Sequence, residues 1–126
     1  MRVLVVDDES RMRKLVKDFL GREGYQVLEA GDGMEAMEVF YDEKDIALII
    51  LDVMMPEMNG FELCRRVKSD MALSHIPVIL LTALSDDSQR LYGFEGGADE
   101  YIQKPFNIEI VKLRIIKLLE ERNRLR

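Results

Sequence analysis

The chain has 126 residues, of which 48% are hydrophobic and 33% charged, a composition typical of a folded globular domain rather than a disordered segment. Its formal net charge of −6 argues against a general nucleic-acid-binding surface, and no apolar run approaches the ~20 residues of a membrane span. A single cysteine cannot form an internal disulfide and no signal-peptide pattern is present, so we expect a cytoplasmic protein with one domain over residues 1–126.

The chain begins with a predicted buried strand and an amphipathic helix. Residues 3–6 are all apolar and lead directly into Asp7 and Asp8, which predicts a strand covered on both faces that ends in two acids. A helix should follow, with Ser10 as its N-cap, because apolar residues then recur at the spacing of one helix face. Glycines within residues 21–24 should end this helix.

A second strand and a second helix come next. Residues 26–30 are more polar than the first strand, as expected of a strand at the edge of a sheet. Asp32 lies in a Gly-Asp-Gly turn and should cap a helix over residues 34–43. The apolar side chains that this helix is expected to bury are Met37, Phe40 and Tyr41.

Residues 46–52 provide the predicted central strand. Six apolar residues, rich in β-branched side chains, run into Asp52 and are too few for an ordinary helix. Pro56 and the Asn59–Gly60 pair then require a loop. Asp52 should therefore lie at the carboxyl end of a buried strand, the edge where open α/β sheets bind ligands.

The pattern continues with a third helix over residues 60–69, whose apolar face should pack in the core. The apolar run 77–82 predicts another buried strand, which ends in the hydroxyl of Thr82. Ser85 can cap a fourth helix that ends near Gly96.

The last part of the chain combines a brief strand with a long helix. The strand, residues 101–103, is followed by Lys104, and Asn107 should cap the helix. The apolar face expected to pack on the sheet consists of Ile108, Val111, Ile115, Leu118 and Leu119. Ile110 and Leu113 fall on roughly the opposite side, so we expect them to be exposed and to form a contact surface.

Five strands that alternate with five helices predict a parallel sheet joined by right-handed crossovers. The strands 3–6, 46–52 and 77–82 are apolar throughout and should be central, whereas the other two should be edge strands. The expected strand order is therefore 2-1-3-4-5, which is the flavodoxin-like doubly wound (βα)5 arrangement of the α/β class.

Parallel strands place their carboxyl ends at one edge of the sheet, so several polar side chains should meet there. These side chains are Asp7, Asp8, Asp52, Thr82 and Lys104. Three neighbouring carboxylates repel one another and require a cation, and oxygen ligands suit Mg²⁺. A hydroxyl and an ammonium group beside the metal suit phosphoryl oxygens, which leaves Asp52 as the carboxylate that accepts the phosphoryl group.

Five sequence motifs occur in order, each at the predicted end of a strand. They are Val-Val-Asp-Asp at 5–8, Leu-Asp-Val-Met-Met-Pro at 51–56 with Gly60, Leu-Thr-Ala at 81–83, Gly-Ala-Asp-Glu-Tyr at 97–101 and Lys-Pro-Phe at 104–106. With these motifs, the chain resembles the receiver domains of response regulators in two-component signalling, over essentially its whole length.

The resemblance implies a role for each acid. Asp52 would be the phosphoacceptor and would also face the metal. Asp8 would bind Mg²⁺ directly, Asp7 would hold a metal-bound water, and the main-chain carbonyl of Met54 would be a further ligand.

The resemblance also implies a phosphoryl donor and a conformational switch. Thr82 and Lys104 would contact the phosphoryl oxygens, and Tyr101 would change rotamer together with Thr82. The donor would be a phosphohistidine of a histidine kinase, so the domain would be a phosphoacceptor rather than an enzyme. Phosphorylation would shift the surface formed by the fourth helix, the fifth strand and the last helix, which could bind an output domain or a second copy.

Residues 74–83 and 104–126 are also similar to receivers embedded in hybrid histidine kinases, in which a DNA-binding output domain follows the last helix. We therefore expect a domain excised from a longer chain, with a free-standing receiver as the other option. Neither direct nucleic-acid binding nor membrane association is expected of the domain itself.

Three rival functions remain open. A phosphohydrolase with an aspartyl-phosphate intermediate would place Asp-x-Asp after the first strand, whereas Asp7 and Asp8 are adjacent and the candidate acceptor follows the third strand. A flavodoxin-like cofactor carrier would need a phosphate-binding loop after the first strand, where this chain has acids. A receiver that is never phosphorylated would lack part of the residue set.

Overall fold

The computed structural model describes residues 1–43, 45–53, 59–82, 96–104 and 106–124. It contains a five-stranded parallel sheet in the order β2-β1-β3-β4-β5. The strands are β1 (Arg2–Val6), β2 (Gln26–Ala30), β3 (Ile46–Asp52), β4 (Val78–Thr82) and β5 (Glu100–Gln103). The helices within the described residues are α1 (Ser10–Arg22), α2 (Gly33–Asp42), α3 (Gly60–Ser69) and α5 (Ile108–Arg124). The predicted fold class and strand order are confirmed, and the fourth helix expected from Ser85 lies outside the described residues.

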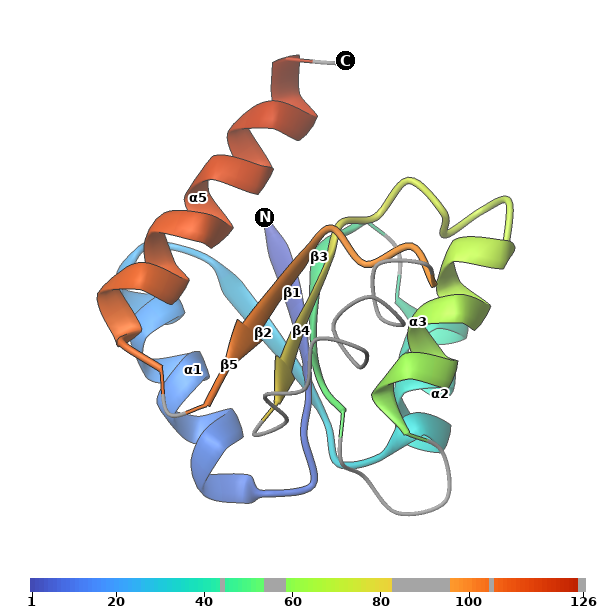
Figure 1. The fold of residues 1–126 in the computed structure, drawn as a ribbon, viewed down its shortest axis with the longest axis horizontal. Coiled ribbons are helices and arrows are strands. Elements are labelled where there is room, and N and C mark those ends of the chain that lie inside the picture. Colours follow the sequence, from blue (N-terminus) through green and yellow to red (C-terminus); the bar gives the residue numbers. More distant parts are fainter. Residues whose placement is uncertain (44, 54–58, 83–95, 105, 125–126) are drawn as a thin grey trace.

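Helices cover the sheet on both faces, with α1 and α5 on one side and α2 and α3 on the other (Figure 1). Successive side chains of a strand point to opposite faces, so β1 contributes to two separate cores. Val3 and Val5 pack in the cluster that contains residues of α1 and α5, whereas Leu4 and Val6 pack in the cluster that contains residues of α2 and α3. A strand covered on both faces needs apolar residues, which explains the apolar runs 3–6 of β1, 46–51 of β3 and 78–81 of β4.

The carboxyl ends of the strands lie at the lower edge of the sheet in Figure 1, and the amino terminus and the end of α5 lie at the opposite edge. The structure confirms that Val111, Ile115 and Leu119 of α5 are buried, while Ile110 and Leu113 are exposed. No helix within the described part of the chain is long and apolar enough to cross a membrane.

Two of the predicted caps are confirmed. The side chain of Asp32 accepts a hydrogen bond from the amide of Glu35 at 2.8 Å, and that of Asn107 accepts one from the amide of Glu109 at 2.8 Å. These bonds satisfy amides at the first turns of α2 and α5, which have no partner inside the helix.

Two local predictions were wrong. Glu9, not Ser10, is the N-cap of α1, and it makes no side-chain capping bond. Its amide instead donates to the Asp7 carboxylate at 2.9 Å, so the acidic turn sets where the helix starts. Tyr41 is 80% exposed because each helical residue turns about 100° from the last, and α2 presents Ala36 and Phe40 to the core.

Candidate functional site

The register of the sheet brings the predicted site residues to one edge. Val6 of β1 pairs with Leu51 of β3, so the next residues of the two strands, Asp7 and Asp52, lie level with each other. Asp52 in turn pairs with Leu81 of β4, the residue before Thr82. The carboxyl ends of β1, β3 and β4 therefore place two acids and one hydroxyl side by side.

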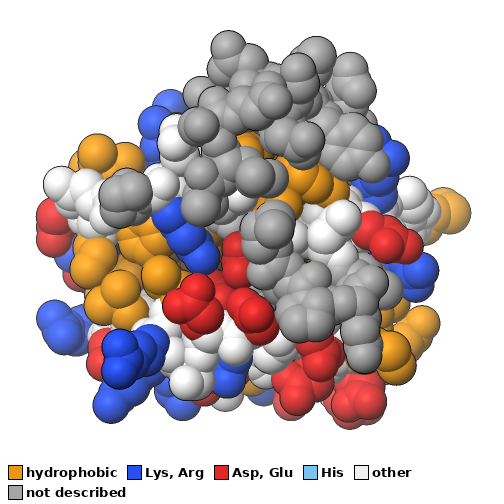
Figure 2. Space-filling model, turned by 60° about the horizontal axis from the view of Figure 1, so that its bottom comes forward, with side chains coloured by type: hydrophobic (Ala, Val, Ile, Leu, Met, Phe, Trp, Pro, Cys, Tyr) orange, Lys and Arg blue, Asp and Glu red, His pale blue; other side chains and the backbone are white. Residues whose placement is uncertain are grey.

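Three carboxylates form a cluster at this edge. Asp7, Asp8 and Asp52 each offer an oxygen, and these atoms lie within 4.8 Å of one another. Asp7 and Asp52 are buried, and Asp8 is the exposed member of the cluster. Figure 2, which looks toward this edge, shows acidic side chains gathered beside a basic one.

Lys104 supplies a positive charge to the cluster. Its Nζ lies 3.5 Å from Oδ2 of Asp7 and 3.6 Å from Oδ1 of Asp52. Its backbone amide donates to the carbonyl of Thr82 at 2.6 Å, which fixes the start of its side chain against the end of β4. Three carboxylates beside one ammonium group give the described cluster an excess of negative charge, and this fits a divalent cation.

Burial raises the pKa of the Asp7 carboxyl above its ordinary value, because burial disfavours the charged form. The hydrogen bond from the Glu9 amide and the charge of Lys104 act in the opposite direction, and the charge of Glu9 adds to the rise. A nearby cation would therefore stabilise the charged form of Asp7.

The donor set suits a hard metal ion. Carboxylate oxygens that converge from two strand ends, one of them exposed to water, match the preference of Mg²⁺ for a few protein oxygens with several retained waters. Met54, whose carbonyl was expected as a further ligand, lies outside the described residues.

Thr82 and Tyr101 lie on the neighbouring strands β4 and β5, and both are buried. Thr82 is fully buried at the end of β4. Tyr101 is 5% exposed and packs in the core cluster between the sheet and the α2–α3 layer. In this structure the aromatic side chain of the expected switch position therefore belongs to the core.

Two contacts near the site were not predicted from the sequence. A Cβ atom added at Gly60 would lie 2.4 Å from the carbonyl oxygen of Asp52, so only glycine permits this close approach of α3 to β3. The guanidinium group of Arg13 donates to the carbonyl oxygen of Asp7 at 2.5 Å. Neither contact has a signal in local periodicity, because each joins two different elements.

The family model described as the response regulator receiver domain matches residues 3–116 of this chain. The chain belongs to the receiver domain family. This confirms the resemblance seen in the sequence and agrees with the geometry of the acidic edge. Acceptance of a phosphoryl group in two-component signalling is the general role of the family, and histidine kinases are its general partners.

The relatives of this receiver domain include both kinases and regulators. Histidine kinase P4 of Formosa agariphila is 45% identical over 124 residues, which are 98% of this chain and 9% of that protein. Transcriptional regulatory protein SrrA of Staphylococcus aureus is 43% identical over 117 residues, 93% of this chain and 47% of that protein. The domain thus spans less than half the length of these curated relatives.

The fold of this domain is also similar to that of a solved response regulator. The response regulator TrrA of Thermotoga maritima, in complex with Mg²⁺ and a beryllofluoride group, is 38% identical to this receiver domain. The two structures superpose with a TM-score of 0.81 over 93% of this chain and 97% of the other.

Proposed function

We propose that this domain is a phosphorylation switch in which Asp52 accepts a phosphoryl group from a phosphohistidine of a histidine kinase. The observation that carries the proposal is the position of Asp52, 3.6 Å from Lys104 Nζ and within 4.8 Å of the acidic oxygens of Asp7 and Asp8. A buried carboxylate held between like charges and one ammonium group is suited to attack at phosphorus once a cation balances the repulsion.

Mg²⁺ is the proposed cofactor. Asp8 would bind it directly, Asp7 would hold a metal-bound water, and Asp52 and the main-chain carbonyl of Met54 would complete the protein ligands. When bound, the ion would neutralise charge on the phosphoryl oxygens during transfer. The complex of TrrA with Mg²⁺ and beryllofluoride supports this assignment.

In the proposed transfer, an oxygen of the Asp52 carboxylate forms a bond to phosphorus in line with the breaking P–N bond of the donor. The electron pair of the broken bond returns to the imidazole of the donor histidine, which takes a proton from solvent. Lys104 and Thr82 would donate hydrogen bonds to the phosphoryl oxygens. The positions of Asp52 and Lys104 before transfer support these roles, since no large movement is needed to bring them together.

The output would arise where β4 meets β5. A phosphoryl group on Asp52 would draw Thr82 toward it, and Tyr101 would rotate into the space that Thr82 leaves. The hydrogen bond between the Lys104 amide and the Thr82 carbonyl supports this coupling, because it joins the ends of the two strands. The expected fourth helix, the other part of this surface, falls within residues 83–95, outside the described residues.

The proposed partner surface centres on α5 and β5. Ile110 is 48% exposed and Leu113 is 65% exposed, and Arg114 pairs with Glu100 of β5 at 2.7 Å. Apolar side chains beside a polar pair are typical of protein interfaces. We propose that a second copy or an output domain binds here, while the kinase binds at the acidic edge and no nucleic acid or membrane is contacted directly.

Intact mass spectrometry tests the proposal. Wild-type protein incubated with acetyl phosphate and Mg²⁺ should gain the mass of one phosphoryl group, and Asp52→Asn should gain none under the same conditions. No gain for the wild type, with either acetyl phosphate or a phosphorylated histidine kinase as donor, would refute the proposal. Steady release of phosphate from a phosphomonoester would instead support the rival phosphohydrolase.

A further inference from the structure

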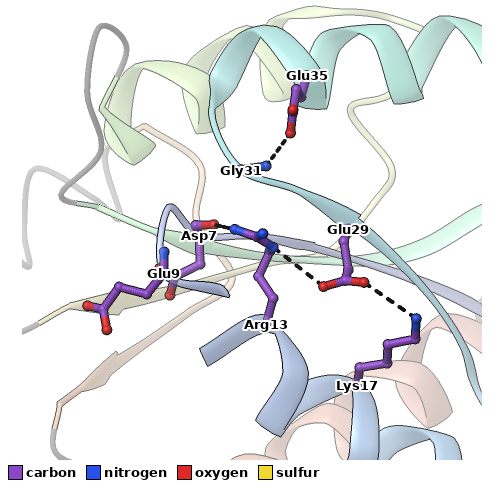
Figure 3. Close-up of polar contacts among 7 residues, drawn as sticks. All are labelled: Asp7, Glu9, Arg13, Lys17, Glu29, Gly31 and Glu35. Carbon is purple, nitrogen blue, oxygen red and sulfur yellow. Dashed lines mark hydrogen bonds and ion pairs between the residues drawn. The ribbon is translucent and has the colours of Figure 1, made fainter. Parts of the chain in front are cut away.

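Arg13 of α1 connects the acidic turn to the edge of the sheet. Its Nη1 donates to the carbonyl oxygen of Asp7 at 2.5 Å, and its Nε lies 3.4 Å from Oε1 of Glu29 on β2. Figure 3 shows the guanidinium group between these two residues. The Nε atom is buried and makes no hydrogen bond within the described part of the chain, so the contact with Asp7 is the stronger of the two.

The bond from Arg13 completes a set of contacts that fix Asp7. The Asp7 amide donates to the carbonyl of Ala30 at 3.1 Å, and Oδ1 accepts from the amide of Glu9 at 2.9 Å. Oδ2 lies 3.5 Å from Lys104 Nζ. The carbonyl is the remaining polar group of Asp7, and Arg13 holds it through a charge-assisted bond, which is stronger than a bond between neutral groups.

We infer that Arg13 is a positioning residue for the metal site. By holding the Asp7 carbonyl, it fixes the peptide between Asp7 and Asp8 and with it the direction of both carboxylates. Without the guanidinium group this carbonyl would lose its partner at a buried residue, and the turn would have to move to regain one. The inference rests on the proposed function, because it concerns the residues that would hold Mg²⁺.

A simpler role would be electrostatic, with Arg13 only offsetting the charge of the acids. The two roles predict opposite effects on metal binding. A positive charge beside a cation site weakens binding, so removing the charge alone should lower the Kd for Mg²⁺. Loss of a group that orients a metal ligand should raise the Kd, typically by about 10- to 100-fold.

Lys17 offers a matched control. It lies on α1 like Arg13, and its Nζ is 3.4 Å from the other carboxylate oxygen of Glu29. Among the described contacts it makes none with Asp7. Arg13→Gln and Lys17→Gln each remove one positive charge and one contact with Glu29, and they differ in the bond to Asp7.

The experiment measures the Kd for Mg²⁺ by isothermal titration calorimetry on wild type, Arg13→Gln and Lys17→Gln. We expect Arg13→Gln to raise the Kd by about tenfold, and Lys17→Gln to leave it unchanged. The rate of phosphorylation by acetyl phosphate should fall for Arg13→Gln at low Mg²⁺ and recover at saturating Mg²⁺, because the loss lies in metal binding.

Arg13→Lys keeps the charge and serves if Arg13→Gln does not fold, as judged by its thermal unfolding. A lysine lacks the planar fork of arginine, so this variant should also raise the Kd, although its charge is unchanged. The inference would be overturned if the arginine variants bound Mg²⁺ as tightly as Lys17→Gln, or more tightly. If the wild type bound no Mg²⁺ and accepted no phosphoryl group, the proposed function itself would fail.

Discussion

The ammonium nitrogen of Lys104 lies 3.6 Å from Oδ1 of Asp52, although the two residues follow different strands, β5 and β3. β4 lies between these strands in the sheet, so the lysine side chain reaches across the end of β4. The side chain is only 17% exposed, and the limited access of solvent strengthens its interaction with the acid. A single long side chain therefore brings the positive charge to the candidate acceptor.

Replacement of Lys104 by methionine should separate metal binding from phosphoryl transfer. The positive charge near Asp7 and Asp52 is lost, so Mg²⁺ should bind more tightly. The rate of phosphorylation at saturating Mg²⁺ should fall by about 10²-fold, the scale for loss of one donor to a developing charge. Calorimetry and intact mass measured over time would check the two effects.

Lys112→Met is the control for this change, because Lys112 pairs with Glu23 and, among the described contacts, makes none with Asp7 or Asp52. It should alter neither the Kd for Mg²⁺ nor the rate. An unchanged rate in Lys104→Met would show that the ammonium group does not act on the transferred group.

Gly60→Ala should destabilise the domain. The added Cβ would lie 2.4 Å from the Asp52 carbonyl oxygen and 2.9 Å from the Cα of Val53, and both are backbone atoms that cannot rotate away. We expect a loss of about 1–3 kcal/mol in the free energy of unfolding, as for other overpacked positions. Urea denaturation followed by circular dichroism would measure it.

Gly21→Ala provides the matched substitution. A Cβ at Gly21 of α1 meets no atom within 4 Å, and alanine favours helix over glycine by up to about 1 kcal/mol. This variant should be as stable as the wild type or more so. Equal stability of the two alanine variants would mean that α3 can move away from β3 at little cost.

Leu113→Asp should weaken binding at the α5 surface without loss of stability. Leu113 is 65% exposed, so an aspartate there breaks no core contact but places a charge within an apolar contact surface. Analytical ultracentrifugation of the phosphorylated protein, with and without an output domain, would detect the change.

Tyr41→Asp is a suitable control, since Tyr41 is 80% exposed on α2, on the opposite face of the sheet (Figure 1). It should leave association unchanged. If Leu113→Asp also leaves association unchanged while Asp52 is still phosphorylated, the α5 surface is not the interface.

The sequence alone predicted the architecture because the burial of a strand on both faces is a local property. Residues 3–6, 46–51 and 78–81 are all apolar, as a strand between two helical layers requires. The position of Asp7, Asp52 and Thr82 at one edge followed from the same pattern, since parallel strands end on the same side. Their roles in phosphoryl transfer stay predictions.

Local patterns were less informative where two neighbouring residues could each be the N-cap of a helix or the side chain that it buries. Ser10 has the usual side chain for an N-cap, yet the helix starts one residue earlier because Asp7 captures the amide of Glu9. Tyr41 follows the buried Phe40 by one residue and therefore points to solvent. Both errors are shifts of one residue, which hydrophobic spacing does not resolve.

The sequence determined which residues lie at the ends of the strands, because that depends on spacing within each element. Only the tertiary structure decided that Arg13 reaches the Asp7 carbonyl, that Lys104 spans β4 to Asp52, and that Gly60 touches the backbone of β3. Each of these contacts joins two different elements. Their distances depend on how the helices pack on the sheet, and the spacing of apolar residues within one element does not specify this packing.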